Sequence, residues 1–267
     1  MAIVSLARLG EGTEYKTALL KLLRPFTEMF EPVPSSLFIY VGALYPAQAE
    51  LGVNPHPQLA ADLIEWAYEG GVTEIKLAAQ AAPGFDFGQS WQLAGYGALK
   101  SYGVDVLDLA AAPRLPRRSS LGLYSRELLL PRPLLQADCL INMGKFRVAE
   151  GRIFGSALGN LAELAELAEL PRETEAFPRA LVDIYSMVTP DLHIIDALSG
   201  KRGWQPQKQD GLLAASDAVA LDMTLAALAA LPAAPMEELN LAAQYGLGCA
   251  NAADISLVGD VEMMISG

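Results

Sequence analysis

The chain has 267 residues, of which 52% are hydrophobic and 19% charged, which excludes a disordered or fibrous protein. A chain of this length can bury a sizeable core. With 31 acidic against 19 basic residues, its formal net charge is −12, so we expect no nucleic-acid binding and no attraction to an anionic membrane.

Only two cysteines, Cys139 and Cys249, are present, and no CxxC motif occurs. A disulfide scaffold, a cysteine-rich zinc site and a cysteine-ligated iron–sulfur cluster are therefore unsupported, and we predict no metal site. The N-terminus does not resemble a signal peptide, and the apolar stretch 218–234 is interrupted by Asp222. We expect a cytoplasmic protein.

Apolar and amphipathic segments alternate along the chain, which predicts alternating strands and helices. Strands are predicted at 3–6, 35–42, 74–79, 104–110, 138–144, 192–198 and 255–259. Helices are predicted at 13–30, 54–70, 91–102 and 216–231, with a further helix from residue 160 onward. This order predicts an α/β fold, a parallel or mixed sheet with helices on both faces, in one domain over residues 1–267.

A Pro- and Arg-rich segment at about 113–133 interrupts the alternation. Within it, residues 121–124 and 127–130 are apolar enough to pair as short strands. We predict that this segment leaves the main sheet as an excursion.

The first candidate site follows the strand 138–144, where Lys145, Arg147 and Arg152 are accompanied by glycines. Ligands in open α/β sheets collect beyond the carboxyl ends of strands, and glycines there allow close backbone approach. The spacing matches neither a P-loop nor a GxGxxG motif. An anion pocket and a plain surface loop with basic residues both remain open.

The second candidate is the end of the strand 192–198, where Asp196 precedes a loop that contains Lys201, Arg202 and Trp204. Cations, glycines and an aromatic ring in one loop can hold a carboxylate, a phosphate or a planar group. An ordinary solvated loop is the alternative.

The third candidate is Asp222, which lies among apolar residues of the helix 216–231. A buried carboxylate is either neutralised or paired with a cation. This predicts that the two basic loops converge on Asp222, with four candidate partners: Lys145, Arg147, Lys201 and Arg202. A structural ion pair and an acid or base with a raised pKa both remain open.

The two histidines are weaker candidates for a functional role. His56 lies between two prolines at a helix start, and His193 lies in a strand with its side chain expected opposite Ile194. We expect structural roles for both. Because Cys139 lies inside a strand and no GxSxG motif occurs, no nucleophilic triad is predicted.

Several segments resemble domain-of-unknown-function family 362, an uncharacterised family, over about residues 36–260. They include ADCLINMGKFR, SALGNL, PDLHIIDALSGKRG and SDAVALD. The last is the most specific, with matches at Ser216, Asp217, Val219, Ala220 and Asp222. Some members carry a ferredoxin-type iron–sulfur module, so the resemblance implies a redox-linked role, here through a separate cluster-bearing protein.

The chain also departs from that family. The family's lysine-proline-asparagine is Val41-Gly42-Ala43 here, its threonine-histidine is Val148-Ala149, and one lysine is Gly159, whereas Lys145, Arg147 and Asn160 match. The departures imply an altered ligand or a loss of chemistry.

We consider two hypotheses. In the first, a basic pocket binds a small anionic or organic ligand, with catalysis and cofactor left undefined; its residues are Lys145, Arg147, Arg152, Asn160, Asp196, Lys201, Arg202 and Asp222. In the second, the protein is a noncatalytic accessory or assembly subunit that binds a protein partner. The apolar content suggests a homo-oligomer.

Overall fold

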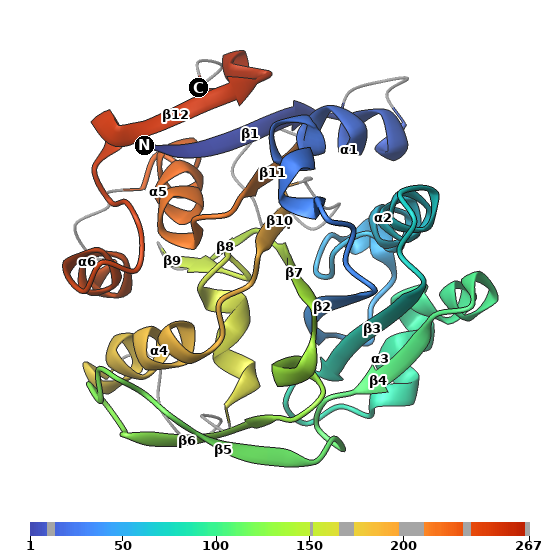
Figure 1. Ribbon diagram of the computed structural model, residues 1–267, viewed down its shortest axis with the longest axis horizontal. Coiled ribbons are helices and arrows are strands. Elements are labelled where there is room, and N and C mark those ends of the chain that lie inside the picture. Colours follow the sequence, from blue (N-terminus) through green and yellow to red (C-terminus); the bar gives the residue numbers. More distant parts are fainter. Residues whose placement is uncertain (10–13, 150–151, 166–173, 198–210, 232–235, 265–267) are drawn as a thin grey trace.

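The computed structural model describes residues 1–9, 14–149, 152–165, 174–197, 211–231 and 236–264. An eight-stranded sheet in the order β12-β1-β11-β10-β7-β2-β3-β4 forms its centre (Figure 1). Neighbouring strands are parallel except that β11 is antiparallel to both β1 and β10. The predicted α/β fold with a mixed sheet is therefore confirmed.

The strands of this sheet are β1 (Ala2–Arg8), β2 (Ser36–Leu44), β3 (Glu74–Ala81), β4 (Asp105–Asp108), β7 (Cys139–Lys145), β10 (Leu192–Asp196), β11 (Gly211–Ala215) and β12 (Ile255–Gly259). The α-helices are α1 (Tyr15–Leu23), α2 (Pro57–Glu69), α3 (Phe87–Leu93), α4 (Ala176–Met187), α5 (Ala218–Leu228) and α6 (Glu237–Gln244). The 3-10 helices are η1 (Arg24–Phe30), η2 (Ala49–Leu51), η3 (Tyr96–Tyr102), η4 (Leu134–Gln136), η5 (Gly159–Leu164), η6 (Ala252–Asp254) and η7 (Val261–Met264).

Helices cover both faces of the sheet, because successive side chains of a strand point to opposite faces. On β2, Phe38 and Tyr40 join the apolar core beneath α4, α5 and η5, whereas Leu37 and Ile39 join the core beneath α1, α2 and α3. The helix α5 is buried over most of its length, as its apolar sequence predicts. Among the described residues, none of the helices is both long and apolar enough to span a bilayer.

Two predicted helices each divide into an α-helix and a 3-10 helix. The helix predicted at 13–30 divides into α1 and η1, with Pro25 in the first turn of η1. The helix predicted at 91–102 divides into α3 and η3, and α3 begins earlier because the Asp86 side chain accepts a hydrogen bond from the amide of Gln89 and caps it. Elements that were not predicted include the small hairpin β8–β9 (Arg147–Ala149 and Arg152–Phe154), β11, α4 and α6.

The Pro- and Arg-rich segment forms a separate two-stranded sheet, β5 (Arg114–Arg118) paired antiparallel with β6 (Glu127–Pro131). The pairing of 121–124 with 127–130 is wrong, because residues 119–125 form the turn. Asp183 on α4 holds that turn: its buried carboxylate accepts hydrogen bonds from the Ser119 hydroxyl and from the amides of residues 123–125, at 2.6–3.1 Å. We call residues 114–131 the basic hairpin.

A buried amide pair connects β2 and β7 with η5. The Asn160 side chain donates to Asn142 Oδ1 at 2.7 Å, and the Tyr40 hydroxyl donates to the Asn160 carbonyl at 3.2 Å. The Asn160 amide occupies the space next to Gly42, where a Cβ atom would overlap its Oδ1. With φ at +83°, Gly42 also has a backbone conformation that favours glycine.

The Gly42→Ala substitution therefore introduces both backbone strain and a steric overlap. We expect a loss of about 3 kcal/mol or more in the free energy of unfolding, measured by urea denaturation. Gly84→Ala is the matched control, because Gly84 has φ +84° but no atom within 4 Å of the added Cβ, so about 1 kcal/mol of strain remains. Equal losses in the two variants would contradict the role given to Asn160.

Candidate functional site

The connections of the sheet reverse direction between β2 and β7. The chain leaves β2 through α2 on one face to reach β3, and it leaves β7 through α4 on the other face to reach β10. Ligands of open α/β sheets bind at such a switch point, beyond the carboxyl ends of the strands. A ligand site is therefore expected around the residues that follow Leu44 and Lys145.

A buried ion pair joins the carboxyl ends of β7 and β10. Lys145, the last residue of β7, lies opposite Asp196, the last residue of β10, and its Nζ donates to Asp196 Oδ1 at 2.9 Å. Their side chains are 4% and 0% exposed. The other oxygen, Oδ2, accepts the backbone amide of His56 at 2.9 Å. Two candidate residues are thus brought together, and they also fix the start of α2.

Arg147 on β8 lies over the ring of Tyr45, the first residue after β2, with 5.1 Å from Cζ to the ring centroid. The side chain is half-buried, and its Nε is buried without a hydrogen-bond partner in the described part of the chain. An aromatic face attracts a guanidinium but satisfies none of its N–H groups. This leaves a cation at the switch point with unused hydrogen-bonding capacity.

Asp222 is buried as predicted, but the expectation that Lys145 or Arg147 pairs with it is wrong. Its two oxygens accept the amides of Ala157 and Leu158 at 2.7 and 3.0 Å, because this turn packs directly on α5. Lys145 pairs with its opposite neighbour on β10 instead. Burial raises the pKa of Asp222 to about 7, although the amides of the turn oppose the increase.

The remaining candidates are placed differently. Asn160 is buried and belongs to the amide pair with Asn142, which gives it a structural role in the described residues. The backbone of Arg152 lies in β9, opposite Ala149. Lys201 and Arg202 lie outside the described residues. The glycine Gly155, with φ +63°, allows its segment to pack against the Lys145 carbonyl, which is the close approach that the sequence indicated.

Both histidines have structural contacts. His193 is buried on the face opposite Ile194, as predicted, and its Nδ1 lies 2.9 Å from the side-chain amide of Asn142. Burial lowers the pKa of His193 to about 3, so it is neutral. His56 caps α2, since its Nδ1 accepts the amide of Gln58 at 3.2 Å and its ring stacks on Tyr15.

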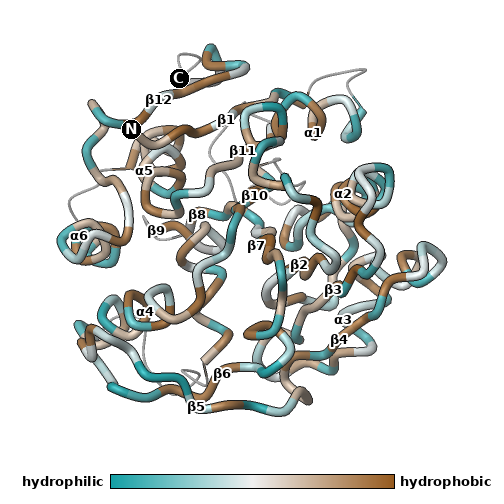
Figure 2. Tube along the Cα trace, viewed as in Figure 1, coloured by the Kyte–Doolittle hydropathy of each residue, from teal (hydrophilic) through white to brown (hydrophobic). Residues whose placement is uncertain are grey.

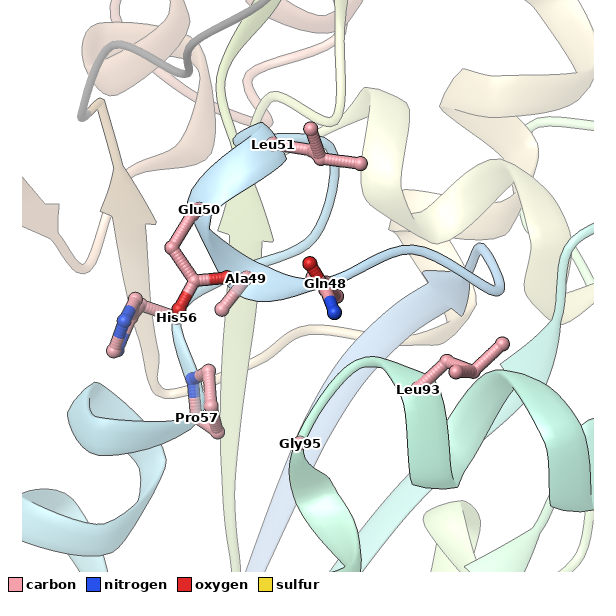
Figure 3. Close-up of a pocket in the computed structure, with 8 residues that line it drawn as sticks. All are labelled: Gln48, Ala49, Glu50, Leu51, His56, Pro57, Leu93 and Gly95. Atoms are coloured by element: carbon pink, nitrogen blue, oxygen red, sulfur yellow. The ribbon is translucent and has the colours of Figure 1, made fainter.

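A cavity of about 590 Å³ opens beside this cluster, between the connection that follows β2 and the end of α3 (Figure 3). Its lining residues are Gln48, Ala49, Glu50, Leu51, His56, Pro57, Leu93 and Gly95. Sequence reasoning missed this cavity, and it also missed Tyr45 and Asn54. The Asn54 side chain binds both the amide and the carbonyl of Tyr45, at 2.9 and 3.0 Å. The proline- and asparagine-rich stretch before α2 was the available signal.

A family model described as a domain of unknown function (DUF362) matches residues 43–227. No match was found among curated proteins. One solved structure similar to this chain is the lactate racemase apoprotein from Thermoanaerobacterium thermosaccharolyticum, with a TM-score of 0.49 and 10% sequence identity. The match covers 74% of this chain and 51% of that one, so this chain spans about half of its length.

The raised pKa of Asp222 predicts a pH-dependent stability. Between the ordinary value of 3.8 and about 7, the folded state binds more protons than the unfolded state, so the free energy of unfolding contributed by this group falls as pH rises. His193 has the opposite effect, because its pKa is lowered on folding. Comparing the unfolding free energies of wild type and Asp222→Asn isolates the contribution of the carboxylate, because both proteins contain His193.

We expect the difference in unfolding free energy, wild type minus Asp222→Asn, to decrease between pH 4 and 7. The slope should approach about 1.4 kcal/mol per pH unit, measured by urea denaturation at each pH. Asp105→Asn removes an exposed carboxylate on β4 and is the control for the loss of one negative charge. A difference that stays constant with pH would show that the Asp222 pKa is not raised.

Proposed function

The chain belongs to the family described as a domain of unknown function (DUF362), and we propose that it binds a small organic anion at the switch point of its sheet. Arg147 is the anion-binding group in this proposal. The ligand class is a molecule with one carboxylate or phosphate group.

The unpartnered Nε of Arg147 is the observation that carries the proposal. This atom is buried without a partner in the described residues, and an unsatisfied buried donor costs about 1–3 kcal/mol. A carboxylate or phosphate oxygen would satisfy this donor, and guanidinium groups bind such anions through two parallel hydrogen bonds. The Tyr45 ring holds the guanidinium plane in place without competing for its N–H groups.

Other features of the edge support the assignment to Arg147. Lys145 already forms a short ion pair with Asp196, so its charge is largely compensated. Phe85 lies edge-on to Tyr45, with ring centroids 6.2 Å apart, and adds exposed apolar surface beside the ring that supports the guanidinium. The site therefore favours an anion with an organic body over a bare inorganic ion.

The proposal is tested by the thermal unfolding midpoint in the presence of acetate, benzoate and inorganic phosphate. We expect a rise in the midpoint with at least one of them, loss of that rise in Arg147→Gln, and partial retention in Arg147→Lys, which keeps the charge but not the planar fork. Arg117→Gln, at an exposed position on β5, is the control and should respond like wild type. An unchanged response in Arg147→Gln would refute the proposal.

A second function, assembly with another copy of this chain, is favoured by the basic hairpin. The segment 113–133 contains five arginines and one glutamate, in a chain with a net charge of −12. Its exposed residues include Arg117, Arg118 and Arg126, together with Leu115 and Leu129. Figure 2 shows β5 mainly in hydrophilic colours beside the more apolar β6. We propose that this surface docks on the acidic body of a second copy.

The hairpin is also rigid enough to act as a docking element. The Asp183 carboxylate fixes its turn through four hydrogen bonds, and Arg114 donates to the carbonyls of Leu129 and Leu164 at 3.1 and 2.8 Å. A surface that is ordered before binding loses little entropy on association.

Light scattering after size-exclusion chromatography tests this second function. We expect a wild-type dimer at low salt that dissociates at high salt, and a monomer for the double variant Arg117→Glu and Arg126→Glu. Arg24→Glu combined with Lys100→Glu makes the same change in charge at two other exposed positions and should leave the dimer intact. A monomeric wild type, or a dimer that survives in the hairpin variant, would refute self-association through the hairpin.

A further inference from the structure

The cavity beside α2 differs in charge from the switch point. Among the described residues that line it, Glu50 is the one acidic residue and none is a lysine or an arginine. His56 adds no positive charge near neutral pH, because burial lowers the pKa of its ring. The described lining therefore carries a net negative charge.

The N-terminus of α2 does not reverse this preference. Helix N-termini attract anions through free N–H groups, but Pro57 has none. The next amide, of Gln58, is bonded to His56 Nδ1 at 3.2 Å, and the amide of Leu59 is bonded to the His56 carbonyl at 3.0 Å. The first turn of the helix thus offers little to a negatively charged ligand.

The walls of the cavity are fixed by hydrogen bonds. Asn54, 1% exposed, donates to the carbonyls of Tyr45 and Ala47, at 3.0 and 3.2 Å, and so holds the loop that leads into η2. Tyr96 donates from its buried hydroxyl to the Pro55 carbonyl at 3.0 Å. The amide of His56 is held by Asp196. A cavity with walls held in this way is formed before a ligand binds.

Polar and apolar groups are separated within the lining. Figure 3 shows the Glu50 carboxylate and the Gln48 amide extending from the η2 segment, with Leu93 and Gly95 across the gap. Leu51, Ala49 and Pro57 complete the apolar part of the lining. A volume of about 590 Å³ lies within the usual range for small-molecule sites.

We propose that this cavity binds a small primary amine with an apolar body, with Glu50 as the counter-ion of the ammonium group. The ammonium donates to the Glu50 carboxylate and the Gln48 side-chain carbonyl, and the apolar body contacts the leucines and the proline. The site is separate from the anion site at Arg147 and does not depend on it.

Benzylamine and benzyl alcohol are the probes, because they share ring and size but differ in charge at neutral pH. We expect wild type to bind benzylamine roughly five-fold more tightly than benzyl alcohol, which is the effect of one opposite charge at about 4 Å in water. Dissociation constants are measured by titration of backbone amide NMR shifts. In Glu50→Gln the preference should disappear while the affinity for benzyl alcohol is unchanged.

Three variants locate the site. Ala49→Leu fills the cavity and should weaken the binding of both probes. Circular dichroism checks that this variant keeps its fold. Glu28→Gln removes an exposed carboxylate on η1 and should behave as wild type, which excludes a general attraction of the amine to an acidic protein. Arg147→Gln should also behave as wild type, so failure of the anion site does not affect this result. Equal affinities for the two probes in wild type, a preference that persists in Glu50→Gln, or unchanged binding in Ala49→Leu would overturn the proposal.

Discussion

The buried ion pair between Lys145 and Asp196 is the constraint on which the carboxyl edge of the sheet depends. Removing two charges from water costs several kcal/mol per ion, and this cost is offset only when the geometry is close and the remaining hydrogen bonds are made. Here the contact is 2.9 Å, and the second carboxylate oxygen binds the His56 amide. The same pair therefore joins β7 and β10 and sets the position at which α2 begins.

Lys145 was predicted to pair with Asp222 but pairs with Asp196. This difference shows how much of the site could be predicted from the sequence. Sequence reasoning identified Asp222 as a carboxylate that needs a partner, because apolar neighbours surround it, and it named Lys145 and Asp196 as candidate site residues at strand ends. It could not identify which partners, because Lys145 and Asp196 meet only through the register of two strands that lie 51 residues apart in sequence. Once that pair forms, Asp222 is satisfied by backbone amides, which no sequence pattern marks as available.

The same reasoning explains the success and failure of the fold prediction. Long apolar strands such as β2 and β7 and the apolar helix α5 were predictable, because burial on both faces of a sheet requires continuous apolar runs. The pairing within the Pro- and Arg-rich segment was not, because it depends on Asp183, about 60 residues away, which binds the turn. Asp183 lies among apolar residues of α4, as Asp222 does in α5, and the same test for a buried carboxylate would have identified it.

The connection after β2 places opposite charges at fixed positions on one short segment. Tyr45 at its start supports the Arg147 guanidinium, and Glu50, five residues later, carries the carboxylate of the cavity. Asn54 and the His56 amide hold both ends of this segment through hydrogen bonds, so its backbone has a fixed position at the edge of the sheet. The Lys145–Asp196 pair contributes to this arrangement, because Asp196 also binds the His56 amide, so the ring that supports the cation and the carboxylate of the cavity lie on one segment that the buried pair helps to hold.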